Sequence, residues 1–73
     1  MYNSQSRATS AGKNDTYCAA VGSFVVAQMP NGKFDYFPQG QPPHVVEQGQ
    51  VKKCGTVVAR FHYNPNGCTW KKA

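Results

Sequence analysis

The side chains of this chain that could do chemistry are three cysteines and two histidines. They are Cys18, His44, Cys54, His62 and Cys68. Thiolate sulfur and imidazole nitrogen are the usual ligands of structural zinc sites, where two ligands commonly share a tight turn. No Cys-x-x-Cys or His-x-x-x-His pair occurs in the chain. This spacing favours small buried thiols over a metal site, and we expect no metal and no cofactor.

The same residues also form a poor catalytic set. A nucleophilic cysteine needs a base and a group that orients the base, and only His44 or His62 could serve as that base. The chain has three carboxylates, at Asp15, Asp35 and Glu47, so acid–base pairs are scarce. An odd number of cysteines argues against a closed disulfide framework. We therefore expect a protein that is not an enzyme, with reduced thiols and a cytoplasmic location.

The positive charge is concentrated towards the end of the sequence. The formal net charge is +5, and residues 51–73 contain five cations and no acid. These five cations are Lys52, Lys53, Arg60, Lys71 and Lys72. Such an asymmetry predicts contacts with a nucleic acid or with an acidic protein surface, although a solvated face that keeps the chain soluble would look the same. No stretch approaches the ~20 apolar residues of a membrane span, so we expect no membrane association.

Two similar segments indicate the elements that carry these residues. Residues 22–37 and 55–72 each contain a β-branched and aromatic run, a Pro-Asn-Gly turn and a second aromatic run. Asn and Gly tolerate positive φ, so each copy predicts a β-hairpin. The absence of Leu and Ile favours strands over helices. We predict a mainly β fold, a small twisted antiparallel sheet or partly open barrel of four to five short strands. One short helical turn has room within this fold, and a sheet packed on one short helix is the alternative.

We predict a disordered N-terminal arm over residues 1–15 and a small β domain over residues 16–73. The arm has one aromatic residue and no β-branched aliphatic residue, so it can bury too little surface to offset its ordering entropy. Tyr2 and Arg7 are its candidate anchors if it folds onto a partner. A first strand is predicted over 16–29 with a break at 22–23, followed by a strand over 33–37. Residues 44–48 are predicted as a strand or a helical turn, and further strands over 51–63 and 68–72.

The location of Trp70 depends on the length of the second turn. A two-residue loop at Asn66-Gly67 pairs Tyr63 with Trp70 and places Trp70 in the core. A three-residue loop pairs His62 with Trp70 instead and gathers both with Arg60 and Lys72 on a binding face. A slip of one residue moves a side chain to the other face of a sheet. Trp70 and His62 are therefore candidate contacts only in the second register.

Two kinds of binding function fit these features. Alternating aromatic and basic residues on strands, as in Arg60-Phe61-His62-Tyr63, are typical of small β-barrels that stack single-stranded nucleic-acid bases. A non-catalytic protein that binds an acidic protein surface would use the same cations, together with aromatic or arginine side chains as anchors. The residues leave both functions open, and in either case we expect a monomer that acts through binding energy.

The chain as a whole resembles the small RNA-polymerase-binding transcription regulators of lytic Xanthomonas phages. The resemblance covers the opening segment 1–7, the length of 73 residues and the basic ending at 70–73. It implies a protein that docks on host RNA polymerase, inhibits σ-dependent initiation and favours terminator read-through. Nascent RNA could then share the basic surface. The resemblance assigns no individual binding residue.

Overall fold

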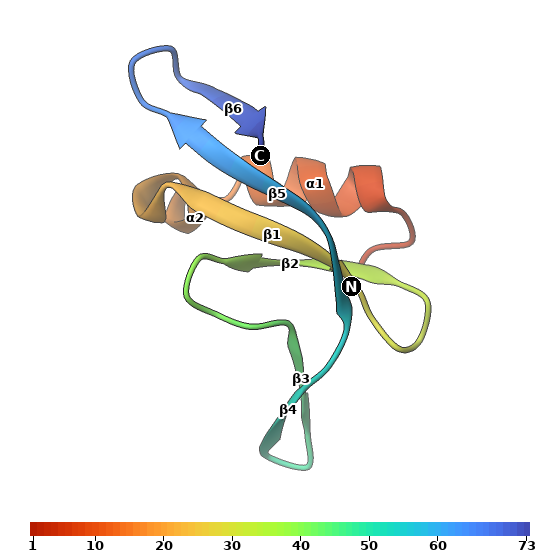
Figure 1. The fold of residues 1–73 in the computed structure, drawn as a ribbon. Helices are drawn as coiled ribbons and strands as arrows, with labels where there is room; N and C mark the ends of the chain where they lie inside the picture. Colours follow the sequence, from red (N-terminus) through yellow and green to blue (C-terminus); the bar gives the residue numbers. More distant parts are fainter.

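The larger sheet of this protein is covered by helices on one face only. A computed structural model describes residues 1–73. In chain order the elements are α1 (Gln5–Lys13), α2 (Thr16–Val21), β1 (Ser23–Gln28), β2 (Phe34–Pro38), β3 (His44–Glu47), β4 (Gln50–Lys53), β5 (Thr56–Asn64) and β6 (Thr69–Lys72). Four strands form an antiparallel sheet in the order β2-β1-β5-β6, and β3 pairs with β4 alone. The β3–β4 hairpin projects away from the rest of the chain (Figure 1). The predicted mainly β fold is confirmed, as an open sheet.

Both predicted Pro-Asn-Gly hairpins are present. In the first, Pro30-Asn31-Gly32 joins β1 to β2, which pair from Gln28 and Phe34 outwards. Gly32 adopts a φ of +83°, a conformation that costs glycine little. The Asn31 side chain accepts a hydrogen bond from the Lys33 amide at 3.0 Å. The second hairpin joins β5 to β6 in the same antiparallel manner.

The strand predicted over 51–63 is two strands. The first ends at Lys53, and Gly55, with a φ of +96°, redirects the chain into β5. A Cβ at this position would lie 2.9 Å from the Met29 sulfur, so the close approach also requires glycine. Residues 44–47 form a strand, which settles the two alternatives for that segment. A two-residue turn with positive φ at Gln48 and Gly49 closes this additional hairpin.

The predicted disorder of residues 1–15 is wrong, because α1 packs directly on the sheet. The Ser4 hydroxyl accepts a hydrogen bond from the Arg7 amide at 3.2 Å and so caps the helix. Ala8 is completely buried, and Gly12 lies against the Phe24 ring of β1. Small residues let a helix approach a sheet closely. The apolar area that offsets the ordering entropy therefore comes largely from a strand and not from the helix itself.

The strand predicted to begin at Thr16 is also wrong over its first part. Residues 16–21 form α2, and the strand begins only at Ser23. The Asp15 carboxylate caps the start of the helix by accepting from the Tyr17 amide at 2.8 Å. Gly22 ends the helix with a φ of +95°, as is common at helix C-termini. The break expected at 22–23 is thus the junction between a helix and a strand.

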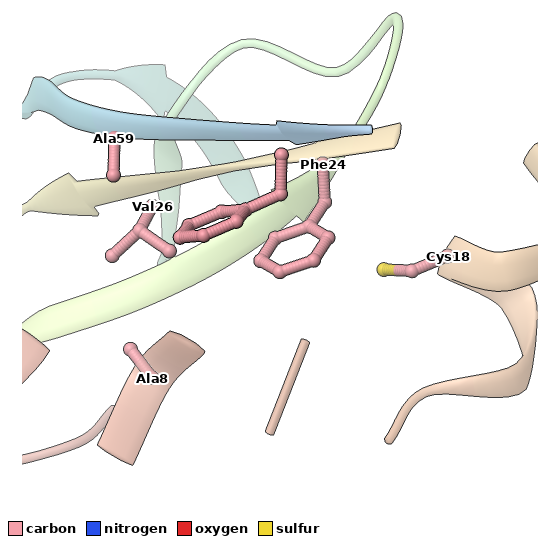
Figure 2. Packing of buried hydrophobic residues seen from close by; sticks show 6 residues of the cluster. Ala8, Cys18, Phe24, Val26 and Ala59 are labelled. Atoms are coloured by element: carbon pink, nitrogen blue, oxygen red, sulfur yellow. The ribbon is translucent and has the colours of Figure 1, made fainter. Parts of the chain in front are cut away.

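Phe24 is the centre of the main core. Figure 2 shows Ala8 and Cys18 pointing from the helices towards Phe24, Val26 and Ala59 of the sheet. The Phe24 ring stacks on Phe61 at 5.1 Å between centroids and meets Trp70 edge-on at 4.9 Å. A second, smaller cluster of Ala27, Met29 and Phe37 contacts Val45 and Cys54 at the base of the β3–β4 hairpin. The chain therefore has one helix-covered core and a minor one near the hairpin.

Candidate interaction surface

The face of the larger sheet that the helices leave open carries a row of basic side chains. Phe24, Val26, Ala59 and Phe61 face the helices, so the residues that alternate with them face the other way. Strand register places Val25 opposite Arg60, Ser23 opposite His62, and His62 opposite Lys71. The row Arg60, His62 and Lys71, here called the basic row, thus crosses from β5 to β6 on the open face.

The β2–β3 connection turns part of this face into a groove. Residues 38–43 run along the sheet and, with the strands, enclose a groove of about 530 Å³. Its apolar lining includes Val25, Val57 and Pro43, and its polar lining includes Arg60 and His62. An apolar floor beside a few polar groups is typical of binding grooves. The groove therefore adjoins two members of the basic row.

No acidic side chain forms a salt bridge with the basic row. The single salt bridge of the protein joins Lys52 to Glu47 at 3.2 Å, on the separate hairpin. Both of its side chains are largely exposed, so it contributes little to stability. Arg60, His62 and Lys71 are themselves exposed. The open face consequently keeps its positive charge available to a partner.

The five predicted cationic contacts lie in three places. Arg60 and Lys71 belong to the basic row, whereas Lys52 and Lys53 lie on β4 of the projecting hairpin. Lys72 pairs with Phe61 and so lies on the helix-covered side of the sheet. The structure therefore does not gather the five predicted cations into one patch.

Trp70 is half-buried and packs against the main core, and its grouping with His62 on a binding face is wrong. The observed pairs are Tyr63 with Trp70 and Asn64 with Thr69, as in the register expected for the shorter loop. The turn itself spans four residues, 65–68. The indole N–H of Trp70 donates to the Lys13 carbonyl at 3.1 Å. His62 points to the opposite face, because neighbouring strand residues alternate.

Tyr2 is a structural residue and not a free anchor. Its amide donates to the Phe34 carbonyl at 2.7 Å, and its carbonyl accepts from the Phe34 amide at 2.9 Å. Its ring is half-buried and lies 6.2 Å from the Tyr36 ring. This pairing extends the edge of β2 by one residue. Arg7 is exposed on α1 and is available to a partner, although not through a folding transition of an arm.

The three thiols are in different environments. Cys18 is completely buried, Cys54 is half-buried and Cys68 is exposed. Burial raises the pKa of Cys18 to about 11, with a smaller contribution from the negative charge of Asp15. No three histidine, cysteine or acidic side chains lie close enough together to bind one metal ion. The ligand types noted in the sequence are thus dispersed over the structure.

We expect Cys68 to react at least a hundredfold faster than Cys18 with a thiol-specific disulfide reagent at pH 8. The thiolate is the reactive form, and Cys18 has both a raised pKa and no exposed surface. Absorbance of the released chromophore follows the reaction. Cys68→Ser should abolish the fast phase, and Cys18→Ser the slowest one. A fast phase that survives in Cys68→Ser and disappears in Cys18→Ser would contradict the structure.

Asp15 makes the stability of the protein depend on pH. Its carboxylate accepts from the Tyr36 hydroxyl at 2.5 Å and from the Tyr17 amide. These hydrogen bonds, with Tyr36 the stronger influence, lower the pKa of Asp15 below its ordinary value of 3.8. The unfolded chain then binds the proton more tightly. The stabilisation is complete above that ordinary value and is lost as pH falls towards the folded-state pKa.

Asp15→Asn should therefore reduce the loss of stability between pH 5 and pH 2. Asparagine can still cap α2, but it does not titrate. Urea unfolding followed by circular dichroism at several pH values measures the effect. Glu47→Gln is the control, because its exposed ion pair with Lys52 should change the pH profile little. A profile for Asp15→Asn as steep as that of the original protein would show that this carboxylate is not responsible.

Sequence reasoning missed the apolar residues that stand beside the cations. Val25 and Val57 line the groove, and Val46 and Val51 form an exposed pair on the projecting hairpin. A signal for this hairpin was present, since Gln48-Gly49 separates two short β-branched segments. Nothing in the local sequence indicates that the loop at 38–43 folds along the sheet.

Comparison with known protein families, with curated proteins and with solved structures yields no match to this chain. Neither helix has the length and apolar character needed to cross a membrane. The interpretation of the surface therefore depends on its own geometry and charge.

Proposed function

We propose that this protein is a non-catalytic regulator that binds bacterial RNA polymerase, inhibits σ-dependent initiation and favours terminator read-through. The observation that supports the proposal best is the basic row beside a groove on the open sheet face, with no acid in a salt bridge to it. The resemblance of the whole chain to phage regulators of this kind gives the partner. Electrostatic complementarity would then provide specificity and fast association.

The mechanism is one of linked binding equilibria. A chain of this size with no catalytic constellation must act by its binding energy. If it occupies polymerase contacts that σ also needs, each protein lowers the apparent affinity of the other by the same factor. If it sits beside the path of nascent RNA, its cations would also attract the transcript and stabilise an elongating complex. Both effects follow from one docked position.

The alternative is a small module that binds single-stranded nucleic acid directly. The structure gives this alternative less support, because most strand aromatics pack towards the helices and Phe37 is buried in the second cluster. Those that pack towards the helices include Phe34, Tyr36, Phe61, Tyr63 and Trp70. Base stacking needs an exposed aromatic platform, and the open face offers only the imidazole of His62 among exposed rings. The cations remain available for phosphates, so the alternative is tested alongside the main proposal.

The decisive experiment combines binding and transcription with purified components. Fluorescently labelled protein is titrated with nuclease-treated core polymerase, and σ-dependent run-off and terminator read-through are then measured on one template. The proposal predicts stoichiometric binding, less run-off product and more read-through. Absence of polymerase binding, together with a single-stranded oligonucleotide affinity that falls steeply with salt, would reject the proposal in favour of the alternative.

A further inference from the structure

The two large apolar side chains with the greatest exposed fraction in the folded protein lie on the β3–β4 hairpin. Val46 and Val51 are 64% and 67% exposed. They are direct cross-strand partners, so the two side chains lie together on one face of the hairpin. The hairpin projects from the sheet (Figure 1), with these valines towards its tip. The result is a compact apolar knob held away from the rest of the chain.

The fold itself makes no use of this knob. The hairpin is anchored at its base, where Val45 and Cys54 contact the small core cluster and His44 lies 5.2 Å from Phe37 between ring centroids. Val46 and Val51 belong to neither core cluster. Strand preference does not require them either, since threonine favours strands without exposing a wholly apolar side chain. The exposed pair is thus unexplained by stability.

The charges around the knob indicate what would cover it. Lys53 and His44 are also cross-strand partners and share the face of Val46 and Val51. Glu47 lies on the opposite face and is paired with Lys52. The face of the knob therefore carries a lysine and no acid. A second copy of the chain would bring two such lysines together, whereas an acidic surface would complement them.

We propose that the hairpin face formed by Val46, Val51 and Lys53 inserts into an apolar pocket with an acidic rim on the protein partner of this chain. The inference rests on the proposed function, because RNA polymerase is the partner that it names. The knob is a second contact, separate from the basic row on the larger sheet. Two contacts on one rigid body reinforce each other, since binding of the first raises the effective concentration of the second.

The test compares two matched double substitutions in polymerase binding. Val46→Thr/Val51→Thr removes the apolar knob and keeps the strand preference. Val21→Thr/Val58→Thr makes the same chemical change at two less exposed valines outside the hairpin. Affinity for core polymerase is measured by fluorescence titration at two salt concentrations, and circular dichroism verifies the fold of each variant.

We expect the hairpin variant to bind about tenfold more weakly at both salt concentrations. The contribution that it loses to the binding free energy is the burial of apolar surface, which salt does not screen. The control variant should bind within threefold of the original protein. Lys53→Glu should behave differently and weaken binding mainly at low salt. Polymerase binding by the original protein with no loss in the hairpin variant would overturn the inference alone. Absence of binding by the original protein would overturn the proposed function and the inference with it.

A measurement of self-association tests whether a second copy of the chain covers the knob instead of another protein. Analytical ultracentrifugation of the chain alone should give a monomer for both the original protein and the hairpin variant. A dimer that dissociates in Val46→Thr/Val51→Thr would assign the knob to a second copy and reject an acidic partner.

Discussion

Gly12→Val should destabilise the protein by about 3 kcal/mol or more and lower its melting temperature by roughly 10–20 °C. A Cβ on Gly12 would lie 2.4 Å from one ring carbon of Phe24 and 2.8 Å from two others. The ring has little freedom to move, because Phe61 stacks on it and Trp70 contacts it edge-on. Helix α1 must therefore shift away from the sheet, which loses contacts along its whole buried face.

Three further variants separate this contact from helix propensity. Gly12→Ala introduces the same clash with one methyl group, opposed by a propensity gain of about 1 kcal/mol, so its net loss should be smaller than that of valine. Ser10→Val places the valine at an exposed position of the same helix and should change the melting temperature by only a few degrees. Phe24→Leu combined with Gly12→Ala should be less destabilising than the sum of the single changes. Additive effects would mean that residues 12 and 24 do not contact each other.

Arg60→Glu/Lys71→Glu should weaken binding to RNA polymerase by roughly a hundredfold at low salt. Both residues belong to the basic row, so the double reversal turns the open sheet face from positive to negative. The affinity of this variant should also depend less steeply on salt, because fewer cations then meet the acidic surface. Both side chains are exposed, and the melting temperature should change by only a few degrees.

A matched control keeps the change in net charge identical. Lys13→Glu/Lys33→Glu also reverses two exposed cations, and both lie outside the open face. We expect at most a fewfold loss of affinity, from the long-range field alone. Equal losses in the two double variants would show that net charge matters and the basic row does not. An unchanged affinity in Arg60→Glu/Lys71→Glu would remove the open face from the mechanism.

The hairpins could be predicted because the residues that determine them are close together in the sequence. Asn31-Gly32 supplies a turn that only a few residue types make easily, and the strands on either side follow from β-branched and aromatic residues. Gly55 lies within the β segment predicted over 51–63, but a bulge and a break look alike in sequence. The close approach of Gly55 to Met29 joins distant parts of the chain and is not visible in the local sequence.

The helices could not be predicted from apolar content, because their packing partner lies elsewhere in the sequence. Helix α1 approaches the sheet through Ala8 and Gly12, residues that carry almost no apolar surface. The large partner is Phe24. Capping signals were present at Ser4 and Asp15, and both act in the structure as capping residues do. They indicate where a helix starts, but not that it will be stable.

The candidate surface was predictable in residue type but not in grouping. Charge asymmetry identified Arg60 and Lys71, yet which neighbours they join depends on the register between β5 and β6. That register follows from the conformation of a four-residue turn in which Cys68 adopts a φ of +51°. Non-glycine residues rarely adopt this conformation, so nothing in the local sequence indicates it at a cysteine.

The position of β5 beside β1 has a consequence for how fast this protein can fold. Each outer pair of the larger sheet joins neighbours in sequence, whereas the central pair joins Phe24 to Phe61. Closing that chain segment costs entropy before any central contact forms. The hairpins can therefore assemble early, and docking of the two centre strands should limit the folding rate. The β3–β4 hairpin lies inside the closing segment. If it forms first, it shortens the effective length of that segment, and we expect it to accelerate this step.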